Sequence, residues 1–137
     1  MSDEHPARAA AQRSMAAVHA KDKAAWVDNF AEDGIVEDPV GSSPLDPTGR
    51  GHRGLEAIAA FWDKQIAPNR VLFDIEHSYA AGPEVANVGT ITILMPNGLV
   101  TIVSGVFTYK VNEAGKLLSL RAFWELPEMK IFPPHES

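Results

Sequence analysis

Asp38 is the residue whose surroundings best suit acid–base chemistry. It lies in the segment 34–40, GIVEDPV, which predicts a short strand that follows a turn at the glycine and ends at the proline. Side chains alternate along a strand, so Asp38 shares a face with Val36 and Val40, whereas Glu37 points the other way. A carboxylate among apolar side chains is costly to ionise, which makes it a candidate general base. The alternative is a turn-forming Asp before a proline.

The composition argues against several other kinds of chemistry. The chain has no cysteine, which excludes disulfides, thiolate catalysis and Cys-ligated metals. Its five histidines are scattered without an HxxxH-type spacing, so we expect no metal site and no cofactor. The net charge of −6 gives no basic footprint for nucleic acid or an anionic membrane surface.

The length of 137 residues fits one domain, predicted to span 1–137 with its core at 8–126. Hydrophobic residues make up 45%, as in ordinary soluble proteins. The acidic N-terminal segment has no apolar core like that of a signal peptide, and no apolar run is long enough to span a bilayer. We therefore expect a soluble cytoplasmic protein.

Three helices are predicted from apolar residues that recur at helical spacing. The first spans 6–20, the second 23–31 with Asp22 as its N-cap, and the third 53–67. Between the second and third helices lies the Gly- and Pro-rich loop 41–51. It exceeds the usual length of a connection, and such long loops often border a functional site.

Four strands are predicted after the helices, at roughly 70–80, 84–95, 99–111 and 117–126. Turn residues separate them, and Asn97-Gly98 is a strong hairpin signal. Adjacent strands joined by short turns form an antiparallel meander. The fold class is therefore α+β, with three helices packed on a curved, mainly antiparallel sheet. Residues from Pro127 on are predicted to lie outside the domain core.

The predicted strands are apolar on both faces, which bears on assembly. In the strand 84–95, one face carries Val85, Ile91 and Ile93, and the other carries Ala86, Val88 and Leu94. One face can pack on the helices, and the other then needs a second cover. For a chain of this size we expect that cover to be a second copy, giving a homodimer.

Several strings, in this order, resemble ketosteroid isomerase and its wider family of cone-shaped α+β barrels, the nuclear transport factor-like or SnoaL-like fold. They are FAED at 30–33 with VEDPVG at 36–41, IAAFW at 58–62, AGK at 114–116 and SLRAFW at 119–124. The likeness covers residues 8–126. It implies a conical barrel with an internal apolar pocket that holds a small hydrophobic, steroid-like ligand.

The resemblance also implies residue roles. In the isomerases an Asp removes a proton beside a ketone, while a Tyr and a protonated Asp donate hydrogen bonds to the resulting oxyanion. The base falls on Asp38, the Tyr falls on Ser14 and the protonated Asp falls on Phe107. The base is kept and both donors are replaced. Trp124, Tyr109, or Ser14 through a water are candidate substitutes in this oxyanion region.

The likeness further predicts a set of pocket residues: Val18, Phe30, Val36, Val40, Trp62, Val88, Val103 and Leu120. Two functions then remain open. One is a steroid delta-isomerase, which moves a C=C bond by proton transfer with Asp38 as base. The other is a non-catalytic protein that binds steroid-like ligands, as the loss of both donors would suggest. A dehydratase or epoxide hydrolase would need further partners, for which His19 and Asp74 are the nearest options.

Overall fold

The computed structural model describes residues 5–134; residues 1–4 and 135–137 of the predicted domain lie outside the described residues. The helical elements are α1 (Pro6–Ala20), α2 (Lys23–Asp28), α3 (Leu55–Phe61), which continues as the π-helix η1 (Trp62–Ile66), and the 3-10 helix η2 (Leu126–Glu128). The strands are β1 (Phe30–Glu37), β2 (His52–Arg53), β3 (Arg70–Ala81), β4 (Glu84–Leu94), β5 (Val100–Val111), β6 (Leu117–Phe123) and β7 (Lys130–Phe132).

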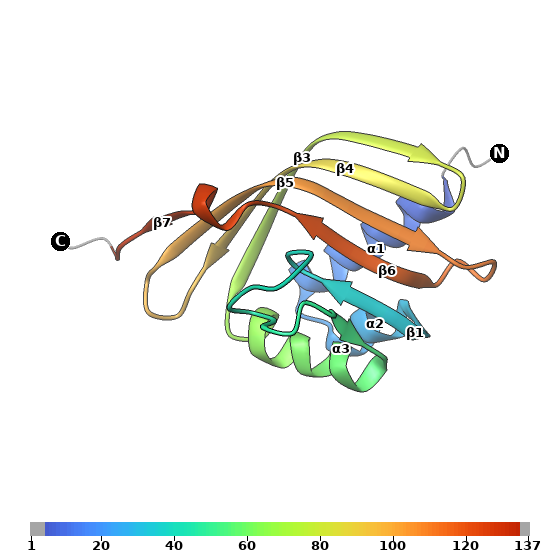
Figure 1. The fold of residues 1–137 in the computed structure, drawn as a ribbon, viewed down its shortest axis with the longest axis horizontal. Helices are drawn as coiled ribbons and strands as arrows, with labels where there is room; N and C mark the ends of the chain where they lie inside the picture. The colour runs from blue at the N-terminus through green and yellow to red at the C-terminus, as the bar shows by residue number, and fades with distance from the viewer. Residues whose placement is uncertain (1–4, 135–137) are drawn as a thin grey trace.

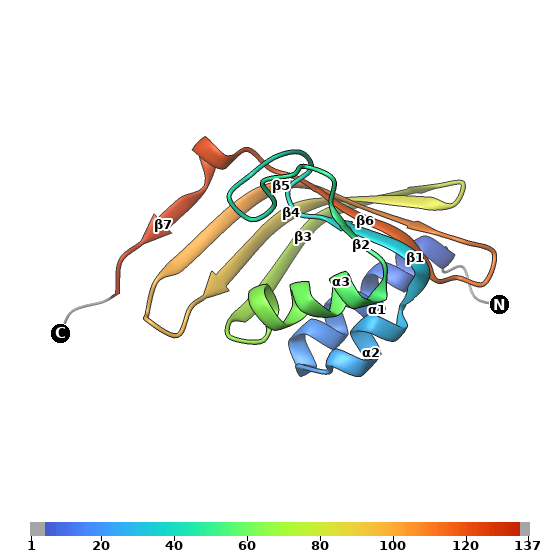
Figure 2. The same cartoon turned by 60° about the horizontal axis from the view of Figure 1, so that its bottom comes forward.

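Within the described residues the strands form one sheet in the order β2-β1-β6-β5-β4-β3, with β7 paired to β5. The pairing of β1 with β6 is parallel and the other pairings are antiparallel. Figure 2 shows the strands arching over the three helices, which all lie on one side of the sheet. The predicted α+β class, with three helices on a curved and mainly antiparallel sheet, is confirmed (Figure 1).

Aromatic rings hold α2 and α3 together on the inner side of the sheet. Trp26, 1% exposed, makes a T-shaped contact with Phe30 at 5.0 Å and lies 5.4 Å from Trp62 and 6.2 Å from Phe61 between ring centroids. Aromatic pairs of this kind contribute about 1 kcal/mol each beyond their buried area. In the part of the chain that the structure describes, no helix is long and apolar enough to span a membrane.

The second helix ends earlier than predicted. Asp22 caps it as expected, since its carboxylate accepts from the backbone N–H of Ala25 at 3.1 Å. The helix stops at Asp28 because the Asn29 carbonyl accepts from the N–H of Leu117 at 2.9 Å, which starts the pairing of β1 with β6. Phe30 therefore begins a strand rather than ending a helix, and the predicted turn at Gly34 is absent.

Residues 130–132 belong to the sheet, so the prediction that the segment from Pro127 on lies outside the domain core is wrong for them. Strand β7 pairs its residues 130–132 with residues 100–102 of β5. Strand β4 pairs along one edge of β5 throughout. On the other edge, β6 pairs with β5 up to Phe123, and β7 pairs with the remaining part of that edge. This short strand carries no apolar alternation long enough to be recognised in the sequence.

Candidate active site

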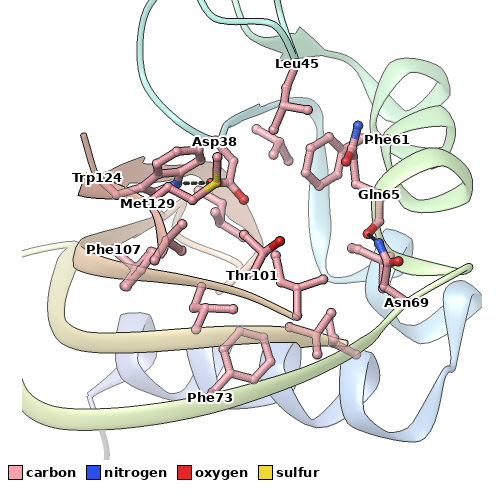
Figure 3. A pocket seen from close by; sticks show the side chains of 18 of the residues that line it. Asp38, Leu45, Phe61, Gln65, Asn69, Phe73, Thr101, Phe107, Trp124 and Met129 are labelled. Atoms are coloured by element: carbon pink, nitrogen blue, oxygen red, sulfur yellow. Dashed lines mark hydrogen bonds between the residues drawn. The ribbon is translucent and has the colours of Figure 1, made fainter. Parts of the chain in front are cut away.

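A cavity of about 300 Å³ lies between the helices and the inner face of the sheet. This is at the small end of the range for small-molecule sites, roughly 300–1,000 Å³. Most of its wall is apolar, and α1, η1, the loop 41–51, β3–β6 and the C-terminal segment all contribute. Its few polar side chains, named below, are the groups that could orient a ligand (Figure 3).

Asp38 lies directly after β1 and lines this cavity, as predicted from strand alternation. Its Oδ1 accepts a hydrogen bond of 2.7 Å from the indole N–H of Trp124, which follows β6. Figure 3 shows the two side chains joined at one side of the cavity. Burial raises the pKa of the Asp38 carboxyl above its usual 3.8, while the Trp124 hydrogen bond and the nearby His52 act in the opposite direction. The site thus holds one oriented carboxylate with raised basicity.

Ser14 and Phe107 also line the cavity and are almost fully buried. The Ser14 hydroxyl accepts a 3.1 Å hydrogen bond from the indole N–H of Trp26, rather than bonding back to its own helix. Phe107 offers no donor. The Trp124 indole, expected among the oxyanion donors, instead directs its N–H to the carboxylate of Asp38. It therefore positions the candidate base and is not free to meet a ligand oxygen.

Four of the eight predicted pocket residues line the cavity: Val18, Val36, Val103 and Leu120. The other four do not, and that part of the prediction is wrong. Phe30 and Trp62 pack against Trp26, which itself lines the cavity. Val88 is on the opposite face of β4 from the buried Val85, since side chains alternate. Val40 lies beyond the end of β1, where the alternation of the strand no longer holds.

Several wall residues were not predicted as pocket residues. Gln65 and Asn69 lie across the cavity from Asp38 (Figure 3), and Gln65 follows Phe61 at helical spacing, a signal that could have found it. Thr101 shares a strand face with Val103, two residues along. The loop and the C-terminal segment add Ser43, Pro44, Leu45, Leu126, Met129 and Ile131, for which the sequence carries no periodic signal.

His52, to which the sequence analysis gave no role, packs its ring 4.9 Å from that of Phe61, a residue of the cavity wall. Its buried Nε2 has no hydrogen-bond partner in the described residues. His19 and Asp74, the partners considered for a dehydratase or epoxide hydrolase, are both exposed. Across residues 5–134, no three His, Cys, Asp or Glu side chains come together as a metal site would require.

The model of the SnoaL-like domain family matches residues 11–120. Among solved structures, Delta 5-3-ketosteroid isomerase from Mycobacterium sp. is 37% identical, with a TM-score of 0.91 over 94% of this chain and 100% of that one. RV0760c from Mycobacterium tuberculosis, in complex with estradiol-17beta-hemisuccinate, is 36% identical, with a TM-score of 0.89 over 93% of this chain and 99% of that one. A computationally designed 17-OHP binder is 34% identical, with a TM-score of 0.91 over 94% of this chain and 100% of that one.

Proposed function

The chain belongs to the SnoaL-like, ketosteroid isomerase-like family of cone-shaped α+β domains, and on that premise we propose that it binds a flat, steroid-like ketone and moves a proton on it. The similar structures include an isomerase of ketosteroids and two proteins described with steroid ligands. An apolar cavity with few polar groups suits a ligand of that kind.

One observation carries the proposed chemistry: the Asp38 carboxylate is fixed by Trp124 on the wall of the cavity, and burial raises its pKa. As a general base it would take a proton from the carbon between a ketone and a C=C bond. The electron pair of that C–H bond would move onto the carbonyl oxygen as a dienolate. Return of the proton two carbons further along would leave the C=C bond conjugated with the ketone. The step balances without an oxidant, reductant or cofactor.

A second candidate function is steroid binding without turnover. It is favoured by Ser14 and Phe107, the cavity residues onto which the resemblance maps the two oxyanion donors of the isomerases. A dienolate formed without a donor would be poorly stabilised in an apolar cavity. The two functions predict the same ligand class and differ in what Asp38 does.

Replacing Asp38 with Asn separates them, because the amide keeps the shape and removes the base. The measurements are the ultraviolet absorbance of the conjugated product formed from a 5-en-3-one steroid, and steroid affinity from tryptophan fluorescence. We expect Asp38→Asn to lower turnover by about 10²- to 10⁴-fold, the usual contribution of a general base. Its steroid affinity should stay unchanged or improve, since a buried charge is removed.

The matched control is Asp74→Asn, an exposed carboxylate on β3 outside the cavity, which should behave as wild type. If wild type binds the steroid and both proteins are inert, Asp38 is not a base and the binding function stands. If Asp38→Asn turns the steroid over as fast as wild type, Asp38 is not the base and binding without turnover is also wrong. If wild type binds no steroid, the proposed ligand class is wrong.

A further inference from the structure

Both indole N–H groups at the Asp38 end of the cavity donate to protein side chains. The Trp124 N–H donates to Asp38, and the Trp26 N–H donates to the Ser14 hydroxyl, which accepts this bond on the short side chain of a serine. Tyr109 differs from them. It lines the same cavity and is only 4% exposed, so its phenol stands in the cavity wall. A buried tyrosine hydroxyl needs a hydrogen-bond partner, and on a cavity wall a ligand can supply one, so this hydroxyl is a candidate contact for a ligand.

The register of the sheet places Tyr109 close to Asp38. Phe107 pairs with Ala122 of β6, and Ala122 lies beside Asp38, since its carbonyl accepts from the N–H of Val40 at 2.9 Å. Tyr109 is two residues further along β5, about 7 Å away and on the same face as Phe107. A phenol also carries its hydroxyl far beyond the reach of a serine hydroxyl, and α1, which carries Ser14, packs against β5.

We propose that the Tyr109 hydroxyl donates the hydrogen bond to the ligand's carbonyl oxygen that Ser14 and Phe107 do not supply. This role rests on the function proposed above and names the group that completes that site. Burial raises the pKa of the Tyr109 phenol, and the negative charge of Asp38 raises it further. The hydroxyl therefore keeps its proton at neutral pH and acts as a donor. The effect of Asp38 also indicates that both groups face the same region.

Other polar side chains of the wall are placed less well for this task. Thr101 lies six residues from Phe107, at the end of β5 that pairs with β7. Gln65 and Asn69 lie on the opposite side of the cavity from Asp38 (Figure 3). A ligand whose ketone oxygen accepted a hydrogen bond from Gln65 or Asn69 would have the carbon next to that ketone on the far side of the cavity from Asp38.

The hydrogen bond would act on the charge that develops during proton transfer. When Asp38 takes the proton, the electron pair passes to the carbonyl oxygen, and the Tyr109 O–H stabilises the resulting oxyanion without giving up its proton. A preorganised donor in a water-poor site acts strongly because the local dielectric is low. Removal of one such donor lowers turnover by about 10²- to 10³-fold.

The test is Tyr109→Phe, which removes only the hydroxyl, with Tyr79→Phe as control. Tyr79 is the other tyrosine of the chain, is 62% exposed and lies on β3 outside the cavity. The first readout is the absorption maximum of a bound 4-en-3-one steroid, which moves to longer wavelength when its carbonyl accepts a hydrogen bond. The second is turnover of the 5-en-3-one steroid, and circular dichroism checks the fold of each variant.

We expect Tyr109→Phe to abolish the spectral shift and to lower turnover by about 10²- to 10³-fold, with Tyr79→Phe unchanged. Asp38→Asn should lose turnover but keep the shift, which separates the donor from the base. If wild type turns out to be inert, the shift alone decides whether Tyr109 contacts the carbonyl. A shift of wild-type size in folded Tyr109→Phe overturns the role of Tyr109 and leaves the proposed function intact. Failure of wild type to bind either steroid overturns both.

Discussion

Asp38 and Trp124 illustrate how one carboxylate can be both oriented and basic. Removal from water disfavours the charged form, whereas the indole N–H, a donor that binds the charged form best, stabilises it. Burial outweighs the hydrogen bond, so the net effect on the pKa of Asp38 is upward. The hydrogen bond still fixes the direction of the carboxylate, which a general base needs in order to reach one carbon atom.

The raised pKa of Asp38 has a consequence for stability. Between the ordinary value of 3.8 and the raised value, the folded protein holds more protons than the unfolded chain. The free energy of unfolding should therefore fall as pH rises through this window and level off above it. Asp38→Asn should lack this fall and exceed wild type in stability at the upper end. Urea unfolding of both proteins from about pH 4 to about pH 9 measures the difference.

The same ionisation governs catalysis with the opposite sign. Any isomerase rate should rise with pH through the raised pKa, because only the ionised carboxylate accepts a proton. The growing stability difference between the two proteins would show that Asp38 ionises. A rate that falls over the same pH range would then contradict the assignment of Asp38 as base.

The sequence was sufficient to place Asp38 but not to show what surrounds it. Alternation from Val36 puts its side chain on the inner face, and that rule holds because β1 pairs with β6 in one register from Ile35 to Glu37, directly before Asp38. The contact with Trp124 joins residues 86 positions apart and depends on the parallel pairing of β1 with β6, which no local pattern reveals. The meeting of Tyr109 and Asp38 on one cavity wall is equally a property of the assembled sheet.

At the level of elements, two glycines allow the sheet to bend around the cavity. Gly89 of β4 pairs with Gly105 of β5, next to a register shift in β3 between Ile75 and His77. A Cβ at Gly89 would lie 2.3 Å from the carbonyl oxygen of Asp74. Bulges and glycines at such points are the usual means of curving a sheet.

Gly89→Ala should therefore destabilise the fold by about 3 kcal/mol, the upper end of the usual cost of overpacking, because backbone rather than a movable side chain blocks the new methyl group. Gly105→Ala should do the same, since its Cβ would lie 2.0 Å from the carbonyl oxygen of Phe123. Gly115→Ala is the control: it has open space but a φ of 81°, so we expect about 1–2 kcal/mol from backbone strain alone. Denaturant midpoints compare the three, and equal losses would show that the close approach does not constrain the sheet.

Regular elements were predictable because apolar spacing repeats over many residues, as in α1 and the long strands β3 to β5. Errors gathered where a tertiary contact overrides a local preference. The segment 29–31 suits a helix but pairs with β6 instead. Strand β7 is too short to show a repeating spacing of apolar residues. Val88 was assigned to the pocket although its strand parity places it opposite Val85. Strand alternation alone therefore predicts that Val88 faces away from the cavity.

At the scale of the whole molecule, the helices of residues 5–134 cover only one face of the sheet, and no other element of that range covers the opposite face (Figure 2). On the uncovered face, Val106 is flanked by Val88 of β4 and by Phe123 of β6, which is 42% exposed. An apolar row in the middle of an open sheet is the kind of surface that a second copy commonly buries. The homodimer expected from the sequence would use this row.

Sedimentation at micromolar concentration should then give about twice 14.8 kDa, with an interface above roughly 2,000 Å² as obligate dimers have. Val106→Lys places a charge at the centre of the row. Burial of that charge against another copy without a partner of opposite charge is costly, so this variant should be a monomer. Ala24→Lys adds the same charge on the exposed side of α2 and should remain dimeric. A wild type that sediments as a monomer would mean that this face tolerates water. A dimer that survives Val106→Lys would place the interface elsewhere.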